Sequence, residues 1–293
     1  MKREPLPIQF RQSIPSGQIF FKLIQTLEKY GLNTVCEEAK CPNRTECYAR
    51  GTLTFQILGD ICTRRCGFCA ETTGTPHPID LSEPEKMIQA AKELNLSHIV
   101  ITAPARDDLA DGGASQFAST IQLLKENLKN VTVEILISDL QGNVNALKTV
   151  LDAGPDVFNH NIETVKRLTP TTRAKATYDR SLEILKFAFA YSREYKIKSG
   201  LMLGLGEDLK EIYETLVDLQ NAGVQYLTIG QYLQPSLKHL PIKKYYDIKE
   251  FEEIKKIAET QKFEKIFCGP LVRSSYHADE MVTPESLKKI ETI

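Results

Sequence analysis

The sequence predicts an α/β protein in which parallel strands form a partial TIM barrel of about six strand-helix units, with an extension at each end. Two observations support this fold class. From Thr52 onward, short β-branched runs alternate with longer amphipathic stretches, which is the pattern of repeated strand-helix units. Most of the short runs are apolar on both faces, as parallel strands covered by helices should be. Because the loops that follow such strands gather on one face, we expect the chemistry there.

The expected strands are bounded by turn residues and rich in Val, Ile, Thr and Phe. They are Thr52–Gly59, His98–Ala103, Val131–Ile137, Val157–Ile162, Ile197–Leu203 and Tyr226–Ile229. A seventh strand around Lys265–Cys268 is left open. Helices are expected over Gln18–Tyr30, Ser82–Leu94 and Tyr178–Tyr195, and Ser82 and Glu85 form a capping-box pattern at the start of the second of these helices.

The chain of 293 residues shows no internal repeat or flexible linker, so we expect one barrel domain at 52–268 with extensions at 1–51 and 269–293. Its 37 basic and 38 acidic residues nearly cancel, which gives no strong field for nucleic acid or an anionic membrane surface. No signal peptide or membrane span is visible, so a cytoplasmic location is expected. In that reducing compartment, seven cysteines favour thiolate ligands or catalysis over disulfides.

The strongest motif is CTRRCGFC, which places Cys62, Cys66 and Cys69 on the loop after the first strand. Three soft thiolates can hold an iron-sulfur cluster, zinc or cuprous copper. A four-iron cube with only three cysteines nearby keeps one iron open for a substrate. The alternatives are a zinc knuckle, or a closed cluster that a distant residue completes.

A second group of three, Cys36, Cys41 and Cys47, lies in the amino-terminal extension. Its spacing is looser than a zinc ribbon needs and matches neither common ferredoxin pattern, so the spacing leaves its metal undecided. The seventh cysteine, Cys268, lies in the apolar run KIFCGPL and is expected in the core.

With Phe68 directly before Cys69, the first motif resembles that of the radical S-adenosylmethionine (radical SAM) superfamily. The two cysteine groups together resemble the lipoyl synthase family, and the resemblance covers nearly the whole chain. The further matching stretches are TLTFQILGDICTRRCGFCA, FNHNIETV, KSGLMLGLGE, LTIGQYLQPS and GPLVRSSYHAD.

The resemblance implies two four-iron four-sulfur clusters and S-adenosylmethionine. In this family a deoxyadenosyl radical removes hydrogen from the sixth and eighth carbons of an octanoyl-lysine, and the second cluster is consumed as the sulfur donor. The octanoyl-lysine belongs to a lipoyl carrier domain or to the glycine cleavage H protein. A ferredoxin or flavodoxin supplies electrons, and an iron-sulfur carrier rebuilds the second cluster. The chemistry agrees, because saturated carbons carry no proton that a general base could remove.

The resemblance also implies residue roles. Cys62, Cys66 and Cys69 would hold the cluster that binds S-adenosylmethionine, and Cys36, Cys41 and Cys47 the sulfur-donor cluster. Ser275, the second serine of the RSSY motif, would complete the donor cluster, with Ser274 as the weaker choice. Arg273 would act at the site as well.

Cofactor-binding candidates follow the strands. They are Phe68, Asn159, Asn161 and Glu163, the last three at the end of the fourth expected strand, where polar side chains can reach the ribose. The loop after the second strand departs from the family pattern, since Ala103 and Pro104 stand where Ser and Val are expected. Arg106 and Asp107 in this loop are therefore only weak candidates.

Three alternatives remain open from the sequence. Another radical SAM sulfur-inserting enzyme with an auxiliary cluster is disfavoured by RSSY. A non-catalytic carrier of electrons with two clusters would need every iron closed, and the first group lacks a fourth cysteine. A zinc-binding interaction protein would contain no iron.

Overall fold

An open sheet of seven parallel strands and one antiparallel edge strand forms the centre of the computed structural model, which describes residues 7–10, 17–192 and 194–282. Across the sheet the order is β1 (Asn33–Thr34), β2 (Thr54–Gln56), β5 (His98–Thr102), β6 (Thr132–Leu136), β7 (Val157–Asn159), β8 (Lys196–Leu203), β9 (Tyr226–Gln231) and β10 (Lys265–Gly269). β1 pairs antiparallel with β2, and every other neighbouring pair is parallel. The ends of the sheet do not pair with each other, which confirms the predicted partial barrel.

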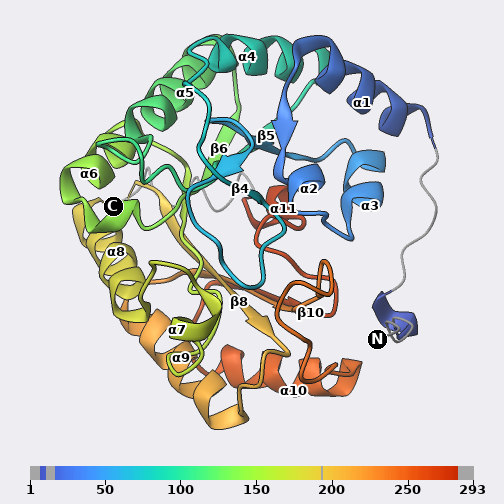
Figure 1. Cartoon of the computed structure of the whole chain (residues 1–293), viewed down its shortest axis with the longest axis vertical. Coiled ribbons are helices and arrows are strands. Elements are labelled where there is room, and N and C mark those ends of the chain that lie inside the picture. Colours follow the sequence, from blue (N-terminus) through green and yellow to red (C-terminus); the bar gives the residue numbers. More distant parts are fainter. Residues whose placement is uncertain (1–6, 11–16, 193, 283–293) are drawn as a thin grey trace.

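Helices surround the sheet on its outer side. Figure 1 shows them as an arc that runs from α1 to α10 around the strands. They are α1 (Gln18–Tyr30), α4 (Glu83–Leu94), α5 (Ala114–Asn127), α6 (Val144–Asp152), α8 (Tyr178–Tyr191), α9 (Leu209–Asn221) and α10 (Ile248–Glu259). Shorter elements complete the described chain: η1 (Ile8–Phe10), α2 (Val35–Glu38), α3 (Arg44–Ala49), β3 (Ile61–Cys62), β4 (Thr72–Thr73), η2 (Leu140–Gly142), α7 (Thr169–Thr172) and α11 (Ala278–Met281).

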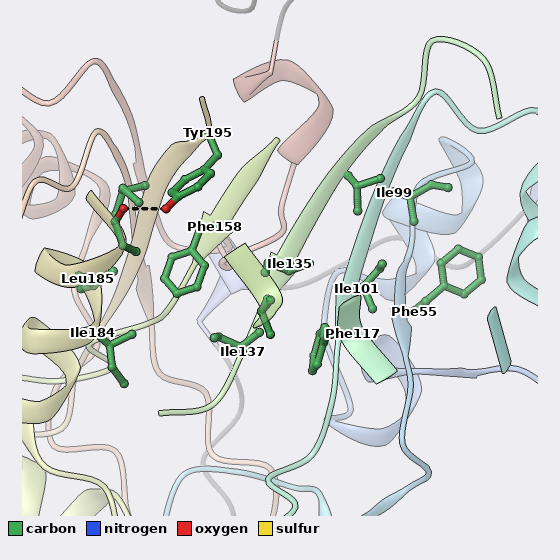
Figure 2. Close-up of a cluster of buried hydrophobic side chains, with 14 of the residues drawn as sticks. Phe55, Ile99, Ile101, Phe117, Ile135, Ile137, Phe158, Ile184, Leu185 and Tyr195 are labelled. Atoms are coloured by element: carbon green, nitrogen blue, oxygen red, sulfur yellow. Dashed lines mark hydrogen bonds between the residues drawn. The ribbon is translucent and has the colours of Figure 1, made fainter. Parts of the chain in front are cut away.

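Alternate strand residues divide the sheet into an outer packing face and an inner face. On β5 and β6, Ile99, Ile101 and Ile135 are buried in the main core, which also holds Phe117 of α5 and Leu185 of α8 (Figure 2). Burying side chains of this size stabilises the fold by roughly 1.5–3 kcal/mol each. The residues between them on the strands point inward, so the inner face is left for the site.

The first parallel strand is shorter than expected, because β2 ends at Gln56 and not at Gly59. Leu58 and Gly59 have left-handed backbones with φ of 68° and 85°. Their N–H groups donate to the carboxylate of Glu83 over 2.9 and 3.4 Å instead of joining the ladder. This turn directs the chain into the loop that carries the first group of cysteines.

Two helix ends differ from the prediction. The capping box at Ser82 is absent: the Ser82 hydroxyl donates to Asp80 over 2.6 Å and caps no helical N–H. The helix expected to reach Tyr195 ends at Tyr191, since the chain must extend before β8 begins at Lys196. Tyr195 is nevertheless buried, and its hydroxyl donates to the Ala188 carbonyl over 2.8 Å, which is the dashed contact in Figure 2.

The seventh strand exists, as β10, and pairs with β9 from Lys265 to Gly269. Cys268 packs against the main core, and its thiol donates to the Phe251 carbonyl at 3.4 Å, which agrees with the predicted packing role. Of the expected extension at 269–293, residues 283–293 lie outside the described part of the chain. Residues 1–6 and 11–16 of the amino-terminal extension do too.

Buried His160 makes stability depend on pH. Its ring nitrogens contact the Ile137 carbonyl and the Ser181 hydroxyl, each at 2.9 Å, and burial lowers its pKa to about 4. The unfolded chain therefore binds a proton at His160 near pH 6.5, whereas the folded chain binds it only near pH 4. The free energy of unfolding therefore decreases as pH falls from about 6.5 toward 4. We expect His160→Gln to reduce the loss between pH 7 and 4.5 by about 2–3 kcal/mol, measured by urea unfolding. If the half-buried control His239→Gln reduces it equally, His160 is not the cause.

Candidate active site

The loop after β2 brings the first cysteine group (Cys62, Cys66 and Cys69) to the carboxyl ends of the parallel strands. Cys62 ends β3 and is buried, and all three thiols line one cavity of about 330 Å³, which we call the first cavity. Phe68 lines it as well. The inner faces of the strands supply its floor, through Thr102, Leu136, Gly200, Met202, Thr228 and Gly230.

Backbone contacts with the last residue of α7 (Thr169–Thr172) and with the segment after it hold this loop. The Gly67 N–H donates to the Thr172 carbonyl over 2.8 Å, and the Ala174 N–H points at the Cys66 sulfur over 3.4 Å. On the far side, the Leu240 N–H donates to the Gly67 carbonyl over 2.9 Å. A side chain at Gly67 would collide with Leu240, because a Cβ there would lie 2.8 Å from the Leu240 Cγ. Gly67 therefore allows the loop to lie close to the long segment after β9.

Asn161 and Glu163 both line the first cavity, although the strand has already ended at Asn159. Glu163 has a left-handed backbone with φ of 68°, a strained conformation for a residue with a side chain. Burial raises the pKa of Glu163, and the charge of Arg173 and a hydrogen bond from Asn161 oppose the rise. The Asn161 Oδ1 is buried and has no hydrogen-bond partner, so the cavity holds an unsatisfied acceptor.

Asn159 does not line the first cavity, contrary to the prediction. It is fully buried one layer deeper in the barrel, and its amide donates to Glu134 over 3.3 Å. Glu134 in turn accepts two bonds, of 2.8 and 3.1 Å, from the ammonium of Lys198. Both partners of this ion pair are completely buried. Asn159 therefore supports a polar layer beneath the cavity.

Sequence reasoning missed Arg173, which lies in the first cavity beside Glu163 and Cys66. Its guanidinium donates to the Ser181 hydroxyl over 2.7 Å, and burial lowers its pKa. The available signal was an arginine eight residues after the stretch FNHNIETV, in a segment that returns to the same face. A fixed guanidinium of this kind suits a carboxylate ligand.

The second cysteine group (Cys36, Cys41 and Cys47) lines a separate cavity of about 40 Å³, which we call the second cavity. Cys36 lies on α2 and Cys47 on α3, and Cys41 lies between these helices. Ser275 lines the second cavity, and its hydroxyl accepts a bond of 2.8 Å from Thr54 on β2. Residues more than two hundred positions apart thus meet at one place.

The carboxy-terminal tail passes between the two cavities. Ser274 lines the first, Ser275 lines the second, and Arg273 lines both. The tail can approach β9 closely because residue 230 is a glycine: a Cβ at this position would overlap the Val272 carbonyl oxygen. The tail is tied to α3 by the Tyr276 hydroxyl, which donates to Glu46 over 2.9 Å, and Glu280 of α11 pairs with Arg50 at the end of α3 over 2.7 Å.

The thiols suit a bound metal centre by chemistry. Burial raises the pKa of Cys36 and of Cys47 to about 12, and it also raises the pKa of Cys66 and Cys69. Thiolates are the metal-binding form, so a cationic centre would replace the protons that these buried thiols otherwise keep. No three His, Cys, Asp or Glu side chains of the described residues converge on the position of a single metal ion. Each group lines a cavity wall, and the first cavity, at about 330 Å³, has room for a centre larger than one ion.

The loop with the unexpected Ala103 and Pro104 does border the first cavity. Arg106 does not line it: the buried guanidinium binds Asp108 over 2.8 Å and the Leu58 carbonyl over 2.9 Å. Asp107 is outside the cavity lining and binds Arg64. Both weak candidates therefore have packing and loop-holding contacts.

Comparisons with known proteins agree with this geometry. Residues 57–219, more than half of the chain, match the radical SAM superfamily. The fold is similar to that of SuiB from Streptococcus suis bound to its precursor peptide SuiA, with a TM-score of 0.58, 13% identity, and coverage of 90% of this chain and 56% of that one. HydG, a maturase of the [FeFe]-hydrogenase, gives a TM-score of 0.58 at 14% identity, with 84% and 63% covered. The chain is thus a radical SAM enzyme.

Curated relatives define the family more narrowly. Lipoyl synthase of Staphylococcus aureus (strain bovine RF122 / ET3-1) is 52% identical over 284 residues, which cover 97% of this chain and 93% of that protein. Lipoyl synthase of Chlamydia felis (strain Fe/C-56) is 50% identical over 277 residues, with 94% and 88% covered. The chain belongs to the lipoyl synthase family, so the family prediction is confirmed. No helix in the described ranges is long and apolar enough to cross a membrane.

Proposed function

We propose that this protein inserts two sulfur atoms into a protein-bound octanoyl-lysine to make the lipoyl group, and that it takes the sulfur from an auxiliary four-iron four-sulfur cluster. The observation that carries the proposal is the pair of thiol-lined cavities, with the tail of Arg273 to Ser275 running between them. A sulfur donor must lie next to the place where the radical forms. Two adjacent cavities meet that requirement.

The first cysteine group would hold the cluster that the superfamily shares, together with S-adenosylmethionine. Phe68, Asn161, Glu163 and Arg173 surround the remaining space of this cavity. The unsatisfied Asn161 oxygen can accept a hydrogen bond from a ribose hydroxyl or an amino group, and Arg173 can bind a carboxylate. When bound, the cluster and S-adenosylmethionine together supply a carbon-based radical that removes hydrogen from an unactivated carbon.

The second group would hold the auxiliary cluster, with Ser275 as its fourth ligand. The assignment of Ser275 is supported by its position, because Ser275 lines the second cavity together with all three thiols, whereas Ser274 lines the first. A hydroxyl oxygen is a harder ligand than a thiolate, so its bond to iron should be the weakest of the four. Arg273, which lines both cavities, would place a positive charge between the two centres.

The chain regions would divide the work accordingly. We assign the auxiliary-cluster cysteines to the extension 1–51, radical formation to the barrel 52–268, and closure of the second cavity to the extension 269–293. An octanoylated lipoyl carrier domain or glycine cleavage H protein would dock at the barrel mouth. A ferredoxin or flavodoxin would reduce the first cluster, and an iron-sulfur carrier would restore the second.

A cytoplasmic location is supported by seven free cysteines, which fit a reducing compartment. The expected absence of nucleic-acid and membrane partners stays a prediction. The alternatives with zinc, or with two closed clusters for electron transfer, lack support from the relatives, which are lipoyl synthases.

The test is a single-turnover assay of anaerobically reconstituted protein with an octanoylated carrier peptide, dithionite and S-adenosylmethionine. We expect about eight irons per chain, from two four-iron cubes, and a peptide mass that reports two added sulfurs. Deoxyadenosine should form at about two molecules per lipoyl group. A peptide without the octanoyl group is the control. Zinc in place of iron, a single cluster, or an unchanged peptide mass would refute the proposal.

A further inference from the structure

Arg64 lies between Cys62 and Cys66 and is buried, with its side chain only 5% exposed. The guanidinium binds Asp107 through Nε at 3.0 Å and through Nη2 at 2.7 Å. Nη2 also contacts Asp139 at 2.6 Å. One side chain of the cysteine loop therefore joins two carboxylates, one from the loop after β5 and one from the loop after β6.

Both carboxylates are themselves anchored to the barrel. Asp139 is completely buried, caps η2 through the Gln141 N–H at 3.2 Å, and accepts a further bond of 2.9 Å from Arg180 on α8. Asp107 is attached to the same cysteine loop a second time, since its N–H donates to the Thr63 hydroxyl over 3.0 Å. The Arg64 contacts hold the pKa of both carboxyls below the ordinary range, although burial opposes this.

Stability alone is a weak reason for such an arrangement. A buried ion pair loses in desolvation most of what it gains in attraction, and apolar residues of similar size often stabilise a protein as well. What a planar guanidinium with several donors adds is direction, because it binds two carboxylates in one fixed geometry. Here that geometry is imposed on a loop in which Cys62 lies two residues before Arg64 and Cys66 lies two residues after it.

We propose that Arg64 is a positioning residue that orients the first cysteine group toward the first cavity, by tying its loop to the loops after β5 and β6. The inference rests on the proposed role of Cys62, Cys66 and Cys69 as cluster ligands. A cluster whose loop could rotate would present its open iron in several directions. With Arg64 in place, the three thiols that would hold the cluster line the same cavity as Arg173, Asn161 and Glu163.

The same loop supplies a matched control. Arg65 is the next residue, lies between the same two cysteines and carries the same charge, but it is exposed. Arg64→Gln and Arg65→Gln thus remove one positive charge from adjacent positions, and only the first breaks the contacts to Asp107 and Asp139. Because Gln at position 64 takes one cationic partner away from each of two carboxylates, which keep Arg180 and Lys175, the double variant Arg64→Gln with Asp139→Asn guards against a folding defect.

In reconstituted protein we expect Arg64→Gln to lower kcat for deoxyadenosine formation about 100-fold, the cost of a displacement of roughly 1 Å at a reacting centre. The electron paramagnetic resonance spectrum of the reduced cluster with S-adenosylmethionine should change as well. Arg64→Lys should recover only part of the rate, since a single ammonium cannot bridge both carboxylates in the same way. Arg65→Gln should resemble the wild type in rate and spectrum.

A measurement on metal-free protein separates this inference from the proposed function. The amide of Thr63 donates to Ala105 and that of Gly67 to Thr172, so both report on the attachment of the loop. We expect hydrogen exchange at these amides to be at least about tenfold faster in Arg64→Gln and in the double variant, and unchanged in Arg65→Gln. Equal exchange and equal deoxyadenosine rates in the two single variants would overturn the positioning role. A wild-type protein that binds no iron would instead refute the proposed function, and the exchange result would stand.

Discussion

Replacing Cys66 with alanine should abolish deoxyadenosine formation, whereas replacing Cys41 with alanine should leave it intact and abolish the lipoyl product. The two thiols line different cavities, so each substitution removes a ligand from one proposed centre and leaves the other centre whole. Removing a contact that only supports a metal ligand typically lowers activity or metal affinity about 10- to 100-fold. Removing the ligand itself should therefore lower activity by more than about 100-fold. Iron should fall to about four atoms per chain in each variant.

The measurement is parallel chromatography of deoxyadenosine and mass spectrometry of the carrier peptide after one turnover. Cys268→Ala is the matched control, because Cys268 is a half-buried cysteine whose thiol lies outside both cavities and contacts the Phe251 carbonyl. It should keep both activities and all of the iron. Lipoyl product from Cys41→Ala would end the sulfur-donor role of the second group. Deoxyadenosine from Cys66→Ala would remove the first group from radical formation.

The separation of the two cysteine groups was predictable from sequence because it follows from local spacing. Cys62, Cys66 and Cys69 are close neighbours on one loop, and a buried parallel strand before them places that loop on the face where such barrels hold their sites. Hydrophobic patterning also predicts β5 to β9 to within a few residues, since strands packed on both faces leave a continuous apolar signal.

The orientation of single side chains was less predictable. Asn159 and Asn161 are two residues apart and would share a face in a regular strand, but β7 ends at Asn159 and Asn161 lies beyond the end of the strand. One amide therefore lies in a buried polar layer and the other in the cavity. Arg173 was missed for a similar reason, because its place depends on how the segment after α7 folds back over the first cysteine loop.

The bond between Thr54 and Ser275 joins residues that no local pattern relates. The RSSY motif was found through its resemblance to the family. The sequence could not test the preference for Ser275 over Ser274, because the two serines are adjacent and lie at almost the same distance from the cysteines along the chain. In space the two serines differ: they are the central residues of a turn in which the Tyr276 N–H donates to the Arg273 carbonyl over 3.1 Å, and Ser274 lines the first cavity whereas Ser275 lines the second. Two adjacent serines thus provide a test in which chemistry and size are constant and only direction differs.

Ser275→Ala should lose lipoyl product by more than about 100-fold while deoxyadenosine still forms, and Ser274→Ala should keep the product within a few-fold. The first substitution removes the hydroxyl that accepts the 2.8 Å bond from Thr54 and leaves three thiols in the second cavity without a fourth protein ligand. The second removes a hydroxyl from the edge of the first cavity, where the cysteine group remains whole. Mössbauer spectra should show the change at the second cluster of Ser275→Ala alone, and Ser275→Cys, with a softer ligand that binds iron more firmly, should retain the cluster but release sulfur more slowly. Normal product from Ser275→Ala, together with loss of product from Ser274→Ala, would move the ligand to the neighbouring residue.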